Sequence, residues 1–241
     1  MIEIKNVSKI YNKKDKIIDN LSCNIQNGEI FGFLGPNGAG KTTTIKMITG
    51  ITDITEGDII IDGYSIKDKP INAKKQFGFV SDNPNVFDSL KAIEYLNFIA
   101  DAYNVSTEDR IKRIEYYSKK FELFNYLNDK IKTYSHGMRQ KLVIIGSLLH
   151  EPQNWILDEP LTGLDPKSLY TIKEIMKEYA KKNKCVFFST HILEIAEVLC
   201  DKIGIINNGK LLYIGTYNEL KNELKQNKSL EELFMEIIKN D

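Results

Sequence analysis

A glycine-rich stretch at residues 35–43 constrains this 241-residue chain more than any other feature. It consists of Gly35, Pro36, Asn37, Gly38, Ala39, Gly40, Lys41, Thr42 and Thr43, and it fits the pattern G-x-x-x-x-G-K-[ST]. The apolar segment 29–34 before it predicts a buried strand, and residues 44–49 after it have helical composition. Glycines let backbone N–H groups turn toward phosphate oxygens, and a helix N-terminus adds partial positive charge. An ordinary strand–turn–helix corner would not need the Lys-Thr pair.

In such a loop, the lysine and the residue after it have defined tasks. Lys41 is predicted to reach the β- and γ-phosphates of a nucleotide, and the Thr42 hydroxyl to ligate Mg²⁺. Two carboxylates, Asp158 and Glu159, follow the apolar run 155–157. Since an acid at the end of a neighbouring strand holds Mg²⁺ in phosphate-loop folds, we assign that role to Asp158. Glu159 is placed to orient or deprotonate an attacking water.

Three further residues each leave two interpretations open. Tyr11 lies in the first connection and either stacks on an adenine or is a half-buried tyrosine at a strand end. Ser135 precedes a helical stretch, where it caps the helix and leaves N–H donors that bind anions readily. Taken alone, that stretch is a plain capped helix. His191 ends the strand-like segment 186–190 and either contacts the γ-phosphate or is structural.

Composition narrows the class of protein. Lysine plus arginine equals aspartate plus glutamate, so the formal charge is zero and a general nucleic-acid binder is not supported. The three cysteines are scattered without a C-x-x-C pair, which gives no sign of a zinc site or a disulfide framework. No apolar run approaches the length of a membrane span, and the N-terminus alternates like a strand rather than a signal peptide. A membrane role would therefore depend on a partner.

The order of predicted elements indicates an α/β fold. We expect a phosphate-loop NTPase core with a mostly parallel sheet, an N-terminal antiparallel β subdomain and a helical insertion. The core would comprise residues 1–83 and 134–215, the helical subdomain residues 84–133, and a helical C-terminal tail residues 216–241. Helical stripes in the insertion are marked by Leu90, Ile93, Ile99 and Tyr103, then by Ile111, Ile114, Phe121 and Phe124.

Five motifs in fixed order make the chain resemble the ATPases of ATP-binding cassette (ABC) transporters. They are the phosphate loop, Tyr134-Ser135-His136-Gly137-Met138, Leu157-Asp158-Glu159, Leu164-Asp165 and Thr190-His191. The resemblance spans nearly the whole chain and implies ATP and Mg²⁺ as cofactors. It implies that two subunits close head to tail, each phosphate loop facing Ser135 and Gly137 of the other chain. It also implies Tyr11 as the adenine-stacking residue, Glu159 as general base, His191 as γ-phosphate sensor and Asp165 as a cross-interface contact.

The chain departs from the family pattern in two segments. The family usually has Gln in the loop after Phe79-Val80, whereas Asp82 occupies that position here. Asp82 either binds Mg²⁺ directly or sits back from it, because it is charged and shorter. In the signature, Ser135 and Gly137 are kept, but Met138 stands where the family has Gln and lacks its hydrogen bond. These departures predict a functional but slower ATPase.

The resemblance predicts an ATPase subunit that drives a separate transmembrane permease. Its partners would be a second ATP-binding subunit, identical or not, and the permease subunits, with no nucleic acid. It would lie peripherally at the cytoplasmic face of the cell membrane. The variant signature, the compact insertion and the segment 230–234 look most like prokaryotic exporters. The alternative is a soluble ABC ATPase acting on ribosomes or DNA. A nucleotide kinase or GTPase switch would lack the signature segment and His191.

Overall fold

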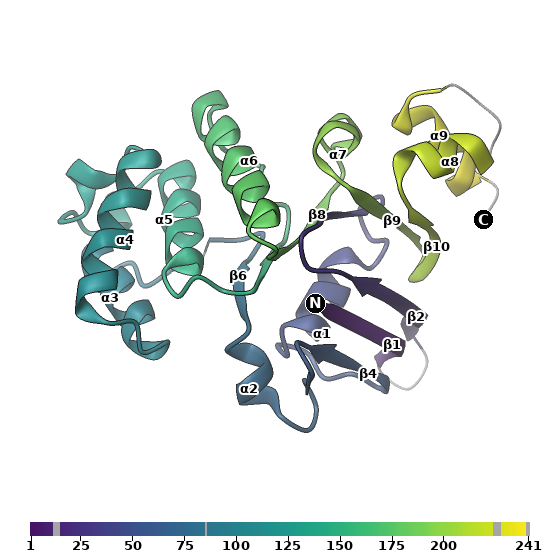
Figure 1. Cartoon of the computed structure of the whole chain (residues 1–241), viewed down its shortest axis with the longest axis horizontal. Coiled ribbons are helices and arrows are strands. Elements are labelled where there is room, and N and C mark those ends of the chain that lie inside the picture. Colours follow the sequence, from purple (N-terminus) through teal and green to yellow (C-terminus); the bar gives the residue numbers. More distant parts are fainter. Residues whose placement is uncertain (12–14, 85, 224–227, 240–241) are drawn as a thin grey trace.

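Two β-sheets flanked by helices make up the computed structural model of the chain, which describes residues 1–11, 15–84, 86–223 and 228–239 (Figure 1). One sheet is formed near the N-terminus, and the other runs through the middle of the molecule. A group of helices lies at one end of the longest axis, and the C-terminal helices lie at the opposite end. The predicted α/β class with a mostly parallel sheet is confirmed.

The first sheet is antiparallel and has the order β2-β1-β4-β5 within the described residues. Its strands are β1 (Ile2–Tyr11), β2 (Asp15–Ile25), β4 (Glu56–Ile61) and β5 (Tyr64–Ser65). In β1, Ile2 and Ile4 are buried while Glu3 between them is partly exposed, as expected for a strand with one covered face. This is the antiparallel subdomain that the sequence predicted.

The second sheet has the order β10-β9-β3-β8-β7-β6 in the part of the chain that is described, and only β10 runs antiparallel to its neighbour there. Its strands are β3 (Ile30–Leu34), β6 (Phe77–Val80), β7 (Asn154–Leu157), β8 (Cys185–Thr190), β9 (Lys202–Asn207) and β10 (Lys210–Gly215). Strand β3 is buried throughout, as parallel strands covered on both faces usually are. The carboxyl ends of β3, β6, β7 and β8 meet at one edge, where the site is built.

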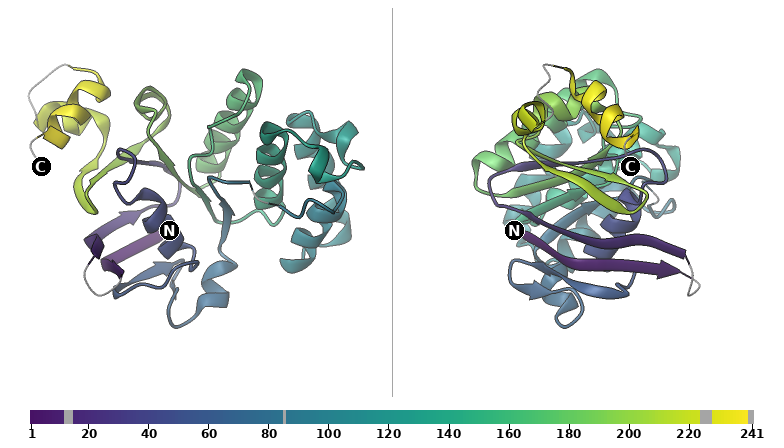
Figure 2. Two further views of the ribbon diagram at one scale, coloured as in Figure 1. Left: turned by 180° about the vertical axis from the view of Figure 1, so that it is seen from behind. Right: turned by 90° about the vertical axis from the view of Figure 1, so that its right-hand side faces the viewer.

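Helix α1 (Lys41–Ile48) is enclosed by the two sheets. Its Ile45, Met47 and Ile48 share one apolar cluster with Ile2 of β1 and Phe31 of β3, and all five side chains are buried. The helix therefore joins the antiparallel sheet to the parallel one. Figure 2 shows the same arrangement from behind and from the side.

The helical insertion contains α3 (Ala92–Ala102), α4 (Thr107–Lys120) and the short 3-10 turns at Phe124–Tyr126 and Ile131–Thr133. It packs against α5 (His136–Leu148), which in turn lies on the sheet, where Trp155 Nε1 donates to Ser147 Oγ over 2.9 Å. The Ser106 hydroxyl caps α4 by accepting from the backbone N–H of Asp109 over 3.2 Å.

The predicted helical stripes are partly wrong. In α3 the buried face consists of Ala92, Tyr95, Leu96 and Ala100, while Ile93 and Ile99 are only partly buried. Two of these four residues are small alanines, which a stripe of large apolar residues does not mark. Near α4, Ile114 and Phe121 are buried as expected, but Ile111 is 61% and Phe124 43% exposed.

The remaining helices pack against the sheets or against one another. They are α2 (Pro70–Lys74), α6 (Pro166–Lys181), α7 (Leu193–Leu199), α8 (Tyr217–Glu223) and α9 (Leu230–Lys239). Ser229 and Glu232 exchange hydrogen bonds at the start of α9 and form a capping box there. Residues 224–227 and 240–241 of the predicted tail lie outside the described residues. The division into core, helical subdomain and tail stays a prediction.

Across the described ranges, no helix combines the length and the apolar composition that crossing a bilayer requires.

Candidate active site

The loop at residues 35–40 connects β3 to α1, as the sequence predicted. A side chain at Gly35 would clash with the carbonyl oxygen of Ile206 on the neighbouring strand. Gly40 has a φ of 109°, which side chains rarely tolerate, and a Cβ there would clash with Ile18. Because Gly40 occupies the N-cap position without a side-chain cap, the first N–H groups of α1 keep their capacity to bind an anion.

A cavity of about 270 Å³ lies over this loop. Its walls are the loop, the first turn of α1 and three residues from elsewhere, which are Ile17, Asp82 and Glu159. The predicted loop residues other than Gly35 and Ala39 are thus brought together with Asp82 and Glu159. Ile17 was not predicted as a site residue, because an isoleucine in a strand carries no signal of ligand contact.

Lys41 supplies the positive charge in the cavity, and its side chain is buried. Its Nζ donates to the carbonyl oxygens of Gly35 over 2.7 Å and Pro36 over 3.2 Å. It also lies 3.5 Å from Glu159 Oε1. The ammonium group is therefore fixed between the loop and the carboxylate, where it can contact phosphate oxygens.

Asp158 is buried behind the cavity wall, and hydroxyl groups surround it. Ser189 Oγ donates to its Oδ1 over 2.6 Å, and the Thr42 hydroxyl is close by. Burial raises the pKa of the Asp158 carboxyl above its usual value, although the hydroxyls of Ser189 and Thr42 act in the opposite direction. The negative charges of Asp82 and Glu159 add smaller increases to that pKa.

These residues fit a bound Mg²⁺. The Thr42 hydroxyl and the Asp158 carboxylate are adjacent, and Asp82 lines the same cavity. Within the described residues there is no group of three or more His, Cys, Asp or Glu arranged to hold a metal ion. Mg²⁺ does not need one, since it is commonly held by one or two carboxylates together with substrate phosphates and water.

Glu159 points away from Asp158, although the two residues are adjacent in the chain. Its φ is +45°, so the backbone turns sharply after Asp158, and its N–H donates to Ser189 Oγ over 2.9 Å. Its Oε2 lies 3.0 Å from His191 Nδ1, while Oε1 faces Lys41. Half of the His191 side chain is exposed. The predicted base and the predicted histidine are therefore in contact at the mouth of the cavity.

The other predicted site residues do not line this cavity in the described part of the chain. Ser135 caps α5 and is exposed, with its Oγ accepting from the N–H of Met138 over 3.3 Å. Gly137 follows in the first turn. Asp165 caps α6. Tyr11 ends β1 opposite Asp15, with its ring 40% exposed and covered on one side by Lys9 Nζ.

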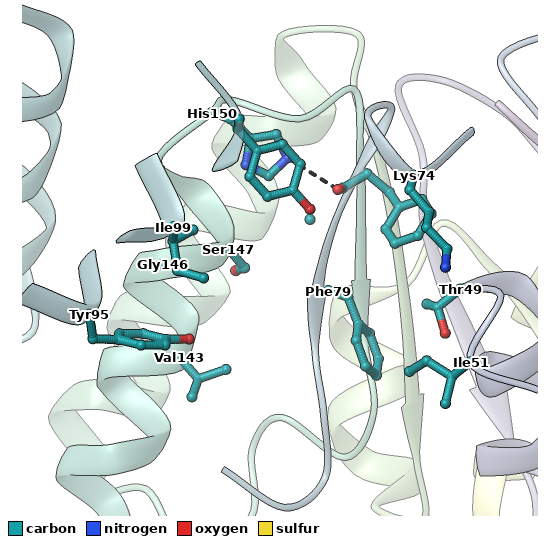
Figure 3. Close-up of a pocket in the computed structure, with 13 residues that line it drawn as sticks. Thr49, Ile51, Lys74, Phe79, Tyr95, Ile99, Val143, Gly146, Ser147 and His150 are labelled. Atoms are coloured by element: carbon teal, nitrogen blue, oxygen red, sulfur yellow. Dashed lines mark hydrogen bonds between the residues drawn. The ribbon is translucent and has the colours of Figure 1, made fainter. Parts of the chain in front are cut away.

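A second cavity of about 270 Å³ lies on the far side of β6 (Figure 3). Apolar side chains from α3, β6 and α5 line most of it, including Tyr95, Ile99, Phe79 and Val143. His150 lies at one end, where its Nε2 hydrogen-bonds to the carbonyl oxygen of Phe77. No nucleophile–base pair is present among its described lining residues, so it does not compete with the first cavity as a catalytic site.

Comparison with known proteins agrees with this geometry. Residues 18–162 match the family described as "ABC transporter". The linearmycin resistance ATP-binding protein LnrL of Bacillus subtilis (strain 168) is 37% identical over 93% of this chain and 72% of its own.

Solved structures agree as well. The structure of an ATP-binding subunit of an ABC transporter superposes with a TM-score of 0.95 at 33% identity, covering 99% of both chains. The dimeric post-hydrolysis structure of the ATP-binding cassette MJ0796 bound to ADP and Pi has a TM-score of 0.81 at 28% identity and covers 90% of this chain and 98% of that one. The chain belongs to the ABC transporter family, as an ATP-binding subunit with ATPase activity.

Proposed function

We propose that two copies of this cassette close head to tail around ATP and that their closure drives a separate membrane permease. The observation that carries this proposal is the placement of Ser135. It is exposed at the N-terminus of α5, and it lies outside the cavity that holds Lys41. A helix start with an exposed cap is suited to a phosphate group. The dimeric arrangement named for the MJ0796 cassette supports the same view.

Each residue of the cavity has a task in hydrolysis under this proposal. Lys41 and the N–H groups of the loop bind the phosphates. Thr42 and Asp158 would hold Mg²⁺, assisted by Asp82, and the ion would neutralise phosphate charge. Glu159 orients a water molecule and accepts its proton.

His191 lies beside the Glu159 carboxylate, and an imidazole there can contact the γ-phosphate while fixing the orientation of the base.

The residues outside the cavity act at the interface under this proposal. Ser135 and Gly137 approach the phosphates of the second copy, and Asp165 contacts that copy. Tyr11 stacks on the adenine, since its ring is exposed at the end of β1, although Ile17 is the nearer apolar wall of the cavity.

The partner that this function requires is a permease, with the cassette bound peripherally at the cytoplasmic face of the membrane. The similarity to a protein named for linearmycin resistance supports an exporter. Recovery of the native chain with membrane proteins would support the permease, whereas recovery with ribosomes or DNA would replace it by the soluble alternative.

The decisive experiment on the site compares two substitutions. Lys41→Ala removes the cation from the cavity, and we expect it to abolish ATP binding. Glu159→Gln keeps the shape but removes the base, so we expect ATP to bind while turnover falls by roughly 10²- to 10⁴-fold. Binding is measured with a fluorescent ATP analogue, and turnover by phosphate release. Glu174→Gln, on the exposed face of α6, is the matched control. Full turnover in Glu159→Gln would show that another group is the base.

A further inference from the structure

The C-terminal helix α9 packs against α7, the helix that follows His191 in the chain (Figure 1). Both helices contribute side chains to one apolar cluster, together with α8, β3 and β9. We call it the tail cluster, and its buried members are Leu34, Leu193, Ala196, Ile203, Ile205, Leu220, Leu230, Leu233 and Phe234. Leu233 of α9 is completely buried there. The apolar face of α9 is therefore part of the packed interior.

Hydrogen bonds fix the place at which α9 begins. Glu197 of α7 accepts from the backbone N–H of Leu230 over 3.1 Å. The Tyr217 hydroxyl at the start of α8 donates to the carbonyl oxygen of Lys228 over 2.8 Å. The first turn of α9 is thus joined to both neighbouring helices, in addition to its apolar contacts.

Helix α7 depends on its neighbours to stay in place. It has 7 residues and α9 has 10, and helices shorter than about 12 residues are marginal on their own. On one side, Leu199 packs α7 against the apolar cluster that contains Trp155. On the other side, Leu193 and Ala196 pack it against the tail cluster. α9 therefore supplies one of the two sides between which α7 is held.

The position of His191 depends in turn on α7. Among the described residues, the side chain of His191 contacts one partner, Glu159, with 3.0 Å between Nδ1 and Oε2. Only Ile192 separates His191 from α7, and its N–H donates to Thr190 Oγ1 over 3.0 Å. A shift of α7 would therefore move the imidazole relative to the carboxylate.

The phosphate loop is less dependent on α9. Leu34 directly precedes the loop and is also a member of the tail cluster. It lies in β3, however, whose backbone pairs with β8 on one side and with β9 on the other. These hydrogen bonds hold β3 without help from α9, whereas α7 lies outside the sheets. Loss of packing from α9 should disturb His191 more than the phosphate loop.

We propose that Leu233 is a positioning residue for His191. Its packing in the tail cluster fixes α7, and α7 holds the imidazole of His191 against Glu159. When this packing is lost, α7 shifts more freely and the imidazole spends less time beside the carboxylate. The inference rests on the proposed function, in which His191 contacts the γ-phosphate and orients the base.

Helix α9 also provides a matched control. Met235 is two residues beyond Leu233, and its side chain is 47% exposed and is not a member of the tail cluster. Met235→Ala removes a side chain of similar size from the same helix. If α9 affected turnover merely by being a well-formed helix, Met235→Ala and Leu233→Ala would have similar effects.

The experiment measures kcat, KM for Mg-ATP and hydrogen exchange of residues 193–199. We expect Leu233→Ala to lower kcat about fivefold and to speed exchange in α7, with little change in KM. Leu233→Met should keep most of kcat, because it conserves volume, and Met235→Ala should leave kcat unchanged. An unaltered kcat in Leu233→Ala would overturn the inference, and so would an equal loss in Met235→Ala. If Leu233→Ala does not fold, Leu233→Val replaces it with the same expectation.

His191→Ala separates this inference from the function on which it rests. We expect His191→Ala to lower kcat, and Leu233→Ala to cost less in that background than in the wild type. A general loss of folded protein would instead lower kcat by the same factor in both backgrounds, and that result would refute the positioning of His191 by Leu233. An unchanged kcat in His191→Ala would refute the role proposed for His191 itself. If turnover of His191→Ala is too slow to measure, His191→Gln serves as the background.

Discussion

At the residue scale, Asp158 and Glu159 are neighbours in the chain but lie in different surroundings. Asp158 is buried among hydroxyl groups, whereas Glu159 opens to the cavity and contacts His191. The positive φ of Glu159 separates the two side chains. One carboxylate is therefore suited to a metal ion and the other to a water molecule, although the residue types are nearly the same.

Asp82 gives a prediction at this scale. It is exposed, lines the cavity and accepts from Ser81 Oγ over 3.0 Å. Asp82→Gln lengthens the side chain and removes a negative charge that raises the pKa of Asp158. We expect turnover to rise severalfold, as measured by phosphate release, while Asp68→Gln on the surface has no effect. An unchanged rate would show that Asp82 is not coupled to the chemistry.

Single residues also show how far the sequence could predict the site. Lys41, Asp158 and Glu159 were identified because a loop pattern and a strand end place them at a known edge of the sheet. Ser189 was missed, since a hydroxyl within a strand has no distinctive pattern, yet it hydrogen-bonds to Asp158 and to the N–H of Glu159. Whether Ile17 lines the cavity depends on how the two sheets pack against each other, and no local sequence pattern encodes that packing.

At the scale of elements, the end of α5 is joined to the sheet by His150. Its Nε2 donates to the carbonyl oxygen of Phe77 over 3.1 Å, and its ring stacks on Tyr103 at 3.7 Å between centroids (Figure 3). Within the described residues its Nδ1 is buried without a hydrogen-bond partner. Burial lowers the pKa of His150 to about 4, so the ring is neutral in the folded protein at neutral pH.

This neutral histidine makes stability depend on pH. Above the unfolded pKa of 6.5 the ring is neutral in both states. As the pH falls from 6.5 to 4, the unfolded chain takes up a proton that the folded protein does not, so stability is lost in that window. The free energy of unfolding falls by at most about 3 kcal/mol over this window. Urea unfolding at pH 7 and at pH 5 measures this decrease.

His150→Gln can keep the bond to Phe77 but does not titrate, so its free energy of unfolding should fall less between the two pH values. His136→Gln, at an exposed histidine, is the control. Equal pH dependence in His150→Gln and the wild type would contradict the assignment.

The sequence predicted which segments form strands and helices better than it predicted which of their side chains are buried. The strand-like segments 29–34, 155–157 and 186–190 each lie within one residue of the bounds of β3, β7 and β8. In α3 the core face includes Ala92 and Ala100, whose small side chains fit where helices approach closely. Which residues of α3 are buried depends on the neighbouring helix. From the sequence of α3 alone, the larger residues beside these alanines were therefore predicted to be buried. The five-residue helix α2 was missed for want of a periodic pattern.

At the scale of the whole molecule, the residues of the five family motifs are divided between two surfaces. Lys41 and Glu159 line the cavity, whereas Ser135 lies outside it. One chain therefore presents two halves of the proposed site that do not meet each other. A second copy related by a two-fold axis would complete both halves at once.

Mixing two impaired variants tests this arrangement. Lys41→Ala damages one half of the site and Ser135→Ala the other, so a mixed dimer has one site with both lesions and one with none. An equal mixture should regain up to about a quarter of wild-type turnover, since half of the dimers are mixed and each has one intact site. Phosphate release is followed as the two proteins are combined. Absence of any recovery, in a mixture shown to dimerise, would refute the head-to-tail site.

The enclosure of α1 between the two sheets has a mechanical consequence. Ile45, Met47 and Ile48 are packed from both sides, so the nucleotide-binding loop leads directly into a helix held within a densely packed apolar cluster. We therefore expect displacements during a cycle of hydrolysis to be larger in the outlying helices than in α1.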